Sequence, residues 1–152
     1  MPDYHLLTEL LGLSHVRVTH YRLSGSDRIE IRVESDLPAA ICPECQHVST
    51  VAHDTSEPQL LRDLPIWGRR CWLEYAPRRF KCVRCEHTFV ERVTWREACQ
   101  AYTHRYTEFI YQRARREPMA QIARDEQLSE DSVRGLFELE AKKLSPAEAT
   151  RA

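Results

Sequence analysis

The chain of 152 residues contains no apolar run near the roughly 20 residues that a membrane-spanning helix requires. Its first residues also lack the basic region and the following apolar run of a secretory signal. These two absences argue against a spanning helix and against export, so we expect a cytoplasmic protein without a membrane partner. The net charge is only −1 at pH 7, so overall charge neither favours nor excludes nucleic acid.

Cysteine occurs six times, and four of the six form two Cys-x-x-Cys pairs. The pairs are Cys42 with Cys45 and Cys82 with Cys85. In a reducing compartment cysteines remain thiols, and two such turns can complete a tetrahedral thiolate shell around zinc. We therefore predict that these four residues bind one Zn2+. The other two, Cys71 and Cys99, are predicted to be buried as small hydrophobic residues.

The predicted site leaves alternatives open. His47, His53 or His87 could replace one cysteine ligand, and a single Cys-x-x-Cys pair would also fit a redox role. Four protein ligands close the shell to water, so this zinc would be structural and not catalytic. Gln46 follows the first pair at a position where such a turn often has glycine, and glycine is scarce in this chain. We expect a left-handed backbone at Gln46.

Hydrophobic periodicity predicts an α+β fold, in which a small β-rich zinc-ribbon module precedes a three-helix helix-turn-helix. Alternating residues predict a hairpin of strands 16–19 and 29–33, and the β pattern returns from 48 to 89. The expected parts are a helix and hairpin over 1–36 that pack on the zinc module, a zinc-ribbon-like domain over 37–96, a helix-turn-helix over 97–144, and a flexible tail over 145–152.

Five leucines between residues 6 and 13 form an apolar stripe on the first predicted helix. This stripe would either cover the hairpin or join two subunits as a homodimer, and we favour the first interpretation.

The charge is unevenly distributed along the chain. Residues 62–96 hold nine basic and four acidic residues, and residues 104–124 hold five basic and two acidic residues. The flanking segments are acidic, with four basic and nine acidic residues over 1–61 and four basic and seven acidic over 125–152. A basic block of this kind is what a phosphate backbone attracts, although a solvated face would show the same composition.

Within the basic block, arginine and lysine alternate with aromatic residues on predicted strands. The candidate contacts to DNA phosphates are Arg69, Arg70, Arg78, Arg79, Lys81 and Arg84. Alternate residues share one face of a strand, so Arg79 and Lys81 should project together while Phe80 turns to the core. An ordinary solvated strand face is the alternative.

The last segment predicts three helices, over 103–116, from Pro118, and over 130–143 with Ser129 as N-cap. In a helix-turn-helix the last helix presents its N-terminal residues to base edges in the major groove. The candidates there are Ser129, Ser132 and Arg134. Glu130 and Asp131 occupy the same turn and are unfavourable beside phosphates, and a plain three-helix bundle is the alternative.

Several ordered motifs together resemble the N-terminal region of the ISL-three family of bacterial insertion-sequence transposases. The motifs are Cys42-Pro43-Glu44-Cys45, His53-Asp54, Leu61-Arg62-Asp63-Leu64-Pro65, Arg78-Arg79-Phe80-Lys81-Cys82 and Phe89-Val90-Glu91. The resemblance covers about residues 6–140. It implies a zinc region and a helix-turn-helix that bind double-stranded DNA at the terminal inverted repeats, in association with the nucleoid. The family's RNase-H-like catalytic domain has no room before Ala152, so we expect no enzymatic activity and no small-molecule substrate.

Two further hypotheses remain at this stage. The chain could act as a transcriptional regulator or transposition inhibitor that occupies the ends of the element. It could instead be a zinc-dependent adaptor for another protein, with Trp67, Trp72 and Tyr75 as an anchor patch. A thiol-based enzyme is the weakest option, because each cysteine pair has a partner pair and no βαβ pattern surrounds either.

Overall fold

The computed structural model describes residues 2–97 and 100–149, with side chains to Ser145. Cys99 lies outside the described residues. The chain divides into two compact units, residues 1–101 and 102–152, and each is described by itself. In the described ranges, no helix is both long and apolar enough to cross a bilayer. The predicted α+β class is confirmed.

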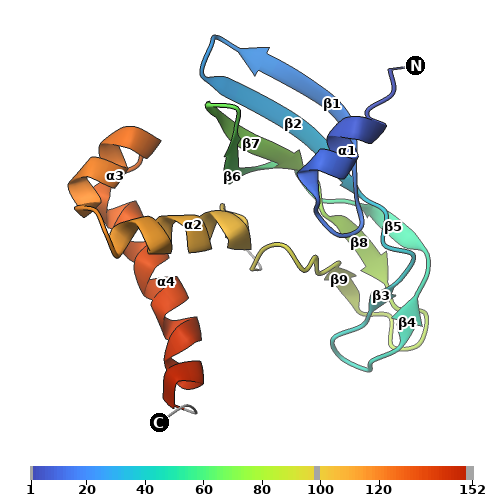
Figure 1. Cartoon of the computed structure of the whole chain (residues 1–152). Coiled ribbons are helices and arrows are strands. Elements are labelled where there is room, and N and C mark those ends of the chain that lie inside the picture. The colour runs from blue at the N-terminus through green and yellow to red at the C-terminus, as the bar shows by residue number, and fades with distance from the viewer. Residues whose placement is uncertain (1, 98–99, 150–152) are drawn as a thin grey trace. The chain divides into compact units, whose positions relative to one another are not determined.

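The first unit begins with a helix and continues as nine strands (Figure 1). Their bounds are α1 His5–Leu11, β1 Val16–Ser24, β2 Arg28–Ser35, β3 Ala40–Ile41, β4 Val48–Ser49, β5 Ala52–Thr55, β6 Gln59–Ile66, β7 Arg69–Tyr75, β8 Arg78–Lys81 and β9 Thr88–Val90. Gly12 takes a left-handed backbone and ends α1.

Four strands form one sheet in the order β1-β2-β7-β6. Its central pair, β2 and β7, is parallel, and Ile31 lies opposite Leu73 in the register. The sheet therefore takes strands from both sides of residue 36, where the sequence places a domain boundary. Periodicity shows that each strand alternates, but it does not show which strand pairs with which.

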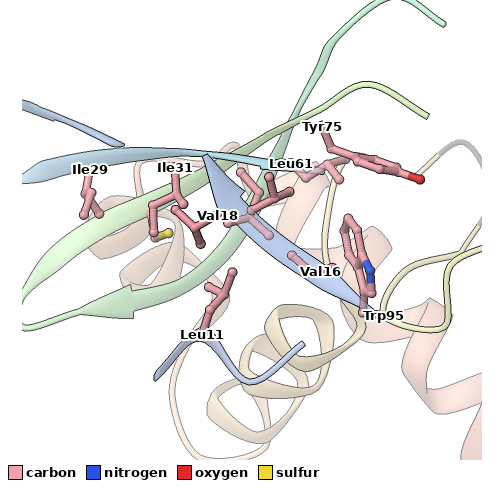
Figure 2. Close-up of a cluster of buried hydrophobic side chains, with 11 residues drawn as sticks. Leu11, Val16, Val18, Ile29, Ile31, Leu61, Tyr75 and Trp95 are labelled. Carbon is pink, nitrogen blue, oxygen red and sulfur yellow. The ribbon is translucent and has the colours of Figure 1, made fainter. Parts of the chain in front are cut away.

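One face of this sheet carries the core of the unit. The buried residues are Leu11, Val16, Val18, Ile29, Ile31, Val33, Leu61, Cys71, Leu73, Tyr75 and Trp95. Figure 2 shows Leu11 of α1 below the sheet and the Trp95 indole beside Tyr75, whose ring centroid lies 5.1 Å away. Cys71 is fully buried there, as predicted. Each large side chain buried in this way contributes about 1.5–3 kcal/mol to stability.

The leucine stripe of α1 is only partly used. Leu11 is buried and Leu7 packs against the core, but Leu6 and Leu10 are exposed. The stripe therefore covers the hairpin through Leu7 and Leu11, as the favoured interpretation predicts, but it is wrong for Leu6 and Leu10, because neighbouring helical residues point about 100° apart. The homodimer stays a prediction.

The short strands build the cysteine-bearing part. Strands β3 and β4 form a hairpin, and β5, β8 and β9 form a three-stranded sheet in the order β5-β8-β9. On β8, Phe80 is buried while Arg79 and Lys81 are exposed, as predicted.

The second unit contains α2 (His104–Ala114), α3 (Met119–Glu126) and α4 (Glu130–Ala149). The Thr103 side chain accepts a hydrogen bond from the Tyr106 backbone and caps α2. The buried residues of this second unit include Tyr106, Ile110, Ile122, Val133 and Leu136.

Candidate metal centre

Each Cys-x-x-Cys pair folds into the same turn. In the first, the Cys42 N–H donates to the His47 carbonyl and the Gln46 N–H donates to the Cys42 carbonyl, both at 2.9 Å. Gln46 has φ 64°, so the left-handed backbone expected there is confirmed. This conformation turns the chain back directly after Cys45, so that the His47 carbonyl reaches the Cys42 N–H.

The second turn repeats the first. The Cys82 N–H donates to the His87 carbonyl and the Glu86 N–H donates to the Cys82 carbonyl, both at 2.9 Å. Glu86 also has φ 64°. Glu86 is not among the residues predicted from the sequence to take this conformation. The signal was the repeat Cys-x-x-Cys-Gln/Glu-His, in which one long polar residue replaces glycine in both copies.

The two turns bring their four sulfurs into one cluster. The Sγ atoms of Cys42, Cys45, Cys82 and Cys85 all lie within 4.8 Å of one another. The Sγ distance is 3.6 Å from Cys42 to Cys85 and 3.5 Å from Cys45 to Cys82. A zinc–sulfur bond of about 2.3 Å gives a tetrahedral edge of about 3.8 Å. The cluster therefore fits one tetrahedral Zn2+, and the predicted structural zinc is confirmed in its chemistry.

Backbone amides prepare the sulfurs for negative charge. The Cys85 N–H donates to the Cys82 sulfur and, with the Arg84 N–H, lowers the pKa of that thiol to about 6. The His87 N–H acts in the same direction on Cys85, but burial and the neighbouring sulfurs raise the pKa of Cys85 to about 12. Without a cation, one thiolate opposes the ionisation of the next. A divalent ion removes this conflict and allows all four to ionise.

The histidine alternatives have other positions. His47 and His87 follow the turns and offer backbone N–H groups to the sulfurs, while His53 lies on exposed β5. In the part of the chain that the structure describes, the four cysteines are the one group of three or more His, Cys, Asp or Glu side chains placed to hold a metal. The shell is therefore closed by sulfur, which leaves no position for a reactive water.

A small apolar cluster supports the sulfurs. Cys42 and Cys82 are fully buried with Ala40, Phe80 and Phe89, and the two phenyl rings stack at 6.0 Å between centroids. So few buried residues cannot offset the conformational entropy of the short strands around them. We conclude that the ion supplies much of the stability of this part.

Glu91 joins the cysteine-bearing part to the four-stranded sheet. Its side chain is fully buried and accepts hydrogen bonds from the Tyr75 hydroxyl at 3.0 Å and from the Ser35 hydroxyl at 2.9 Å. The Arg78 guanidinium donates at 2.9 and 3.1 Å, and the Arg78 backbone N–H donates at 3.0 Å. Sequence reasoning missed this group, because its members are distant in sequence.

Several predicted DNA contacts are used inside the unit. Arg78 donates to Glu91 and, at 2.8 Å, to the Leu37 carbonyl. Arg79 forms an ion pair with Asp54 on the neighbouring strand. Arg69 and Arg70 reach the turn between β1 and β2, where they bond to the Gly25 carbonyl at 2.9 Å and to the Asp27 carboxylate at 3.2 Å. These four side chains hold strands together.

Lys81 and Arg84 have exposed side chains and no ion pair among the described residues, whereas the exposed Arg79 is paired with Asp54. Lys81 ends β8 just before the second cysteine turn, and Arg84 lies inside that turn. They are therefore the members of the predicted basic set best placed to meet a phosphate.

The helical candidates lie at the start of α4. Ser129 accepts a hydrogen bond from the Ser132 N–H at 3.0 Å, so the predicted N-cap is confirmed. Arg134 is exposed and pairs with Asp131 at 2.9 Å. Glu130 and Asp131 occupy the first turn of α4, where their negative charges interact favourably with the helix dipole.

The proposed aromatic anchor patch is wrong. Trp67 is 92% exposed, but Tyr75 is 1% exposed and belongs to the core. Trp72 lies under the guanidinium groups of Arg28 and Arg62, whose Cζ atoms are 3.8 and 4.5 Å from its ring centroid. The three side chains therefore do not form one surface.

Comparison with known proteins adds one finding. Residues 38–85 match the family model of the zinc-finger of transposase IS204/IS1001/IS1096/IS1165. No curated protein and no solved structure matches the chain. The matched segment begins before the first cysteine turn and ends at Cys85, so it contains all four ligands. Residues 38–85 are therefore similar to the zinc-finger of this transposase family, which agrees with the predicted resemblance.

Proposed function

We propose that the chain is a sequence-specific DNA-binding module of a transposase, which recognises the terminal inverted repeats of an insertion sequence. The observation that carries the proposal is the transposase zinc-finger match over the segment that holds the four-sulfur cluster. The proposal assigns binding, and not strand transfer, to residues 1–152. Zinc has a structural part in it, because it fixes the two cysteine turns and the basic side chains on them.

We assign non-specific affinity to the second cysteine turn. Lys81 and Arg84 are exposed on a segment whose backbone is held by two zinc ligands. Binding to phosphates would therefore order only these two side chains and not the backbone that carries them. The ion-paired Arg79 is a weaker candidate, because DNA would have to compete with Asp54.

We assign base recognition to a helix-turn-helix formed by α3 and α4. Gln127 takes a left-handed backbone after α3, and Ser129 caps α4 two residues later. Val133 is fully buried, which anchors α4 and leaves Ser132 and Arg134 on its outer side. In the free protein Arg134 is paired with Asp131. On bound DNA, the edge of a guanine would replace Asp131 as the partner of Arg134.

The test is a salt titration of binding to duplex DNA with an inverted-repeat sequence and with a scrambled control. The logarithm of the association constant should fall linearly with the logarithm of salt concentration. Lys81→Ala and Arg84→Ala should each reduce that slope by about 0.9. Lys142→Ala removes the same charge from an exposed site on α4 and should leave the slope unchanged.

Arg134→Ala should instead reduce the preference for the specific duplex, by about 1–3 kcal/mol at one base pair. Absence of salt-sensitive binding by the zinc-loaded chain would contradict the DNA-binding role. Equal slopes for all variants would reject only the assignment of Lys81 and Arg84.

A further inference from the structure

The turn between β6 and β7 has an unusual residue at its tip. Ile66 pairs with Arg69, so Trp67 and Gly68 form a two-residue connection. Both have positive φ, at 45° and 78°, as in the type I′ turn that suits the twist of a hairpin. Asparagine is favoured at the first of these positions, whereas a bulky aromatic residue is strained there.

Because the Trp67 side chain is exposed, burial contributes almost no free energy to offset this strain. It is 92% exposed, whereas Trp95 is 5% exposed and Trp72 contacts the guanidinium groups of Arg28 and Arg62. Strained residues persist where the surrounding structure holds them, and they are concentrated at functional sites. A fully presented indole on a strained turn therefore indicates a surface made for contact.

The turn is also held in place. Beside it, the Arg69 guanidinium bonds to the Gly25 carbonyl at 2.9 Å, and the Arg70 N–H bonds to the Asp27 carbonyl at 2.8 Å. The β6–β7 turn is thereby tied to the β1–β2 turn, and the two lie at the same end of the sheet (Figure 1). Trp67 therefore stands on a fixed support.

We propose that Trp67 stacks on a nucleobase of bound DNA. This inference rests on the proposed function and adds a contact that neither the zinc site nor the helices provide. An indole on a rigid support stacks on any base and loses little freedom in doing so. The face of a base can come from an intact duplex step that opens around a wedge, or from an unpaired base.

The experiment compares Trp67→Asn and Trp67→Phe with the wild-type zinc-loaded chain. Asparagine is the residue that this turn prefers, so the melting temperature should rise by about 2–4 °C. DNA affinity should nevertheless fall about 5- to 150-fold, the factor that corresponds to one lost base stack. Phenylalanine should retain part of the affinity.

Two DNA probes distinguish the sources of the base: a short intact duplex and the same duplex with one unpaired 2-aminopurine. Quenching of indole fluorescence at saturating DNA should occur in the wild type and disappear in Trp67→Asn, which keeps Trp72 and Trp95. A loss of affinity on both probes indicates insertion between pairs, and a loss on the second alone indicates stacking on an unpaired base.

Wild-type affinity in Trp67→Asn on both probes, or an unquenched indole at saturation, would overturn the inference while salt-sensitive binding through Lys81 still supports the proposed function. If the wild type binds neither probe, the proposed function and this inference both fail. Binding of Trp67 to a protein surface without DNA would also overturn it.

Discussion

At the scale of single residues, Glu91 has the most demanding position. Burial alone raises the pKa of this carboxyl, but the hydrogen bonds from Arg78, Ser35 and Tyr75 together lower it below its usual value. Burial, and to a smaller extent the contact with the Glu91 carboxylate, raise the pKa of Tyr75. Arg78 keeps part of its side chain in solvent, so the ion pair is not wholly desolvated.

We expect Glu91→Gln to lower the free energy of unfolding by about 3 kcal/mol at neutral pH, because Arg78 then lacks its charged partner. A folded-state pKa below the usual 4.5 means that the ionised pair stabilises the fold above about pH 4.5. That stabilisation is lost as the pH falls through the lowered pKa. Urea unfolding of both proteins from pH 7 to acid should show their difference shrinking, and a constant difference would contradict the pair.

The candidate zinc ligands could be assigned from sequence because two residues fix the spacing within each turn, and two complementary turns specify a four-ligand site. The DNA contacts could not. Arg78, Arg79 and Lys81 read alike in the sequence, but their neighbours across the strands separate a buried ion pair, an exposed ion pair and an exposed cation. Such neighbours depend on register, which residue type does not reveal.

At the scale of elements, the end of α3 shows how the turn toward α4 is made. Gln127 has φ 54°, and the Leu128 N–H donates to the Ala123 carbonyl at 2.9 Å, which closes a Schellman motif. Glycine is the residue that this position usually takes, so the present chain accepts a modest cost in the αL region.

Gln127→Gly should therefore raise the free energy of unfolding of the helical unit by about 1 kcal/mol, because the left-handed conformation then carries no Cβ penalty. Gln121→Gly, inside α3, is the matched control and should lower it by about 1 kcal/mol. Thermal unfolding followed by helical circular dichroism measures both. Two changes of the same sign would refute the assigned conformation of the turn.

At the scale of the whole molecule, the two units differ in what stabilises them. The helices α2, α3 and α4 pack their apolar faces against one another over residues 104–145, with Tyr111 and Phe137 stacked at 5.0 Å between ring centroids. The cysteine-bearing strands have only a few buried residues besides the sulfurs. Loss of metal should therefore affect one unit far more than the other.

Elemental analysis should find one zinc per chain. Removal by a chelator should abolish the protection of amide hydrogens in β8 and β9 while the helical circular dichroism of residues 104–149 largely persists. Cys85→Ala should lose the zinc, whereas Cys71→Ala, in the sheet core, should retain it. Equal zinc content in the two variants would rule out the four-sulfur site.

The local features could be predicted from the order of residues alone: the two cysteine turns, the alternating strands, the capped helices and the candidate ligands for zinc. Each follows from residues a few positions apart, whose geometry the backbone fixes. The pairing of β2 with β7, the partly buried ion pair of Arg78 with Glu91 and the exposure of Trp67 became visible only in the folded chain. These depend on register and burial between distant segments, because solvent exclusion belongs to the assembled fold and not to any short stretch of chain.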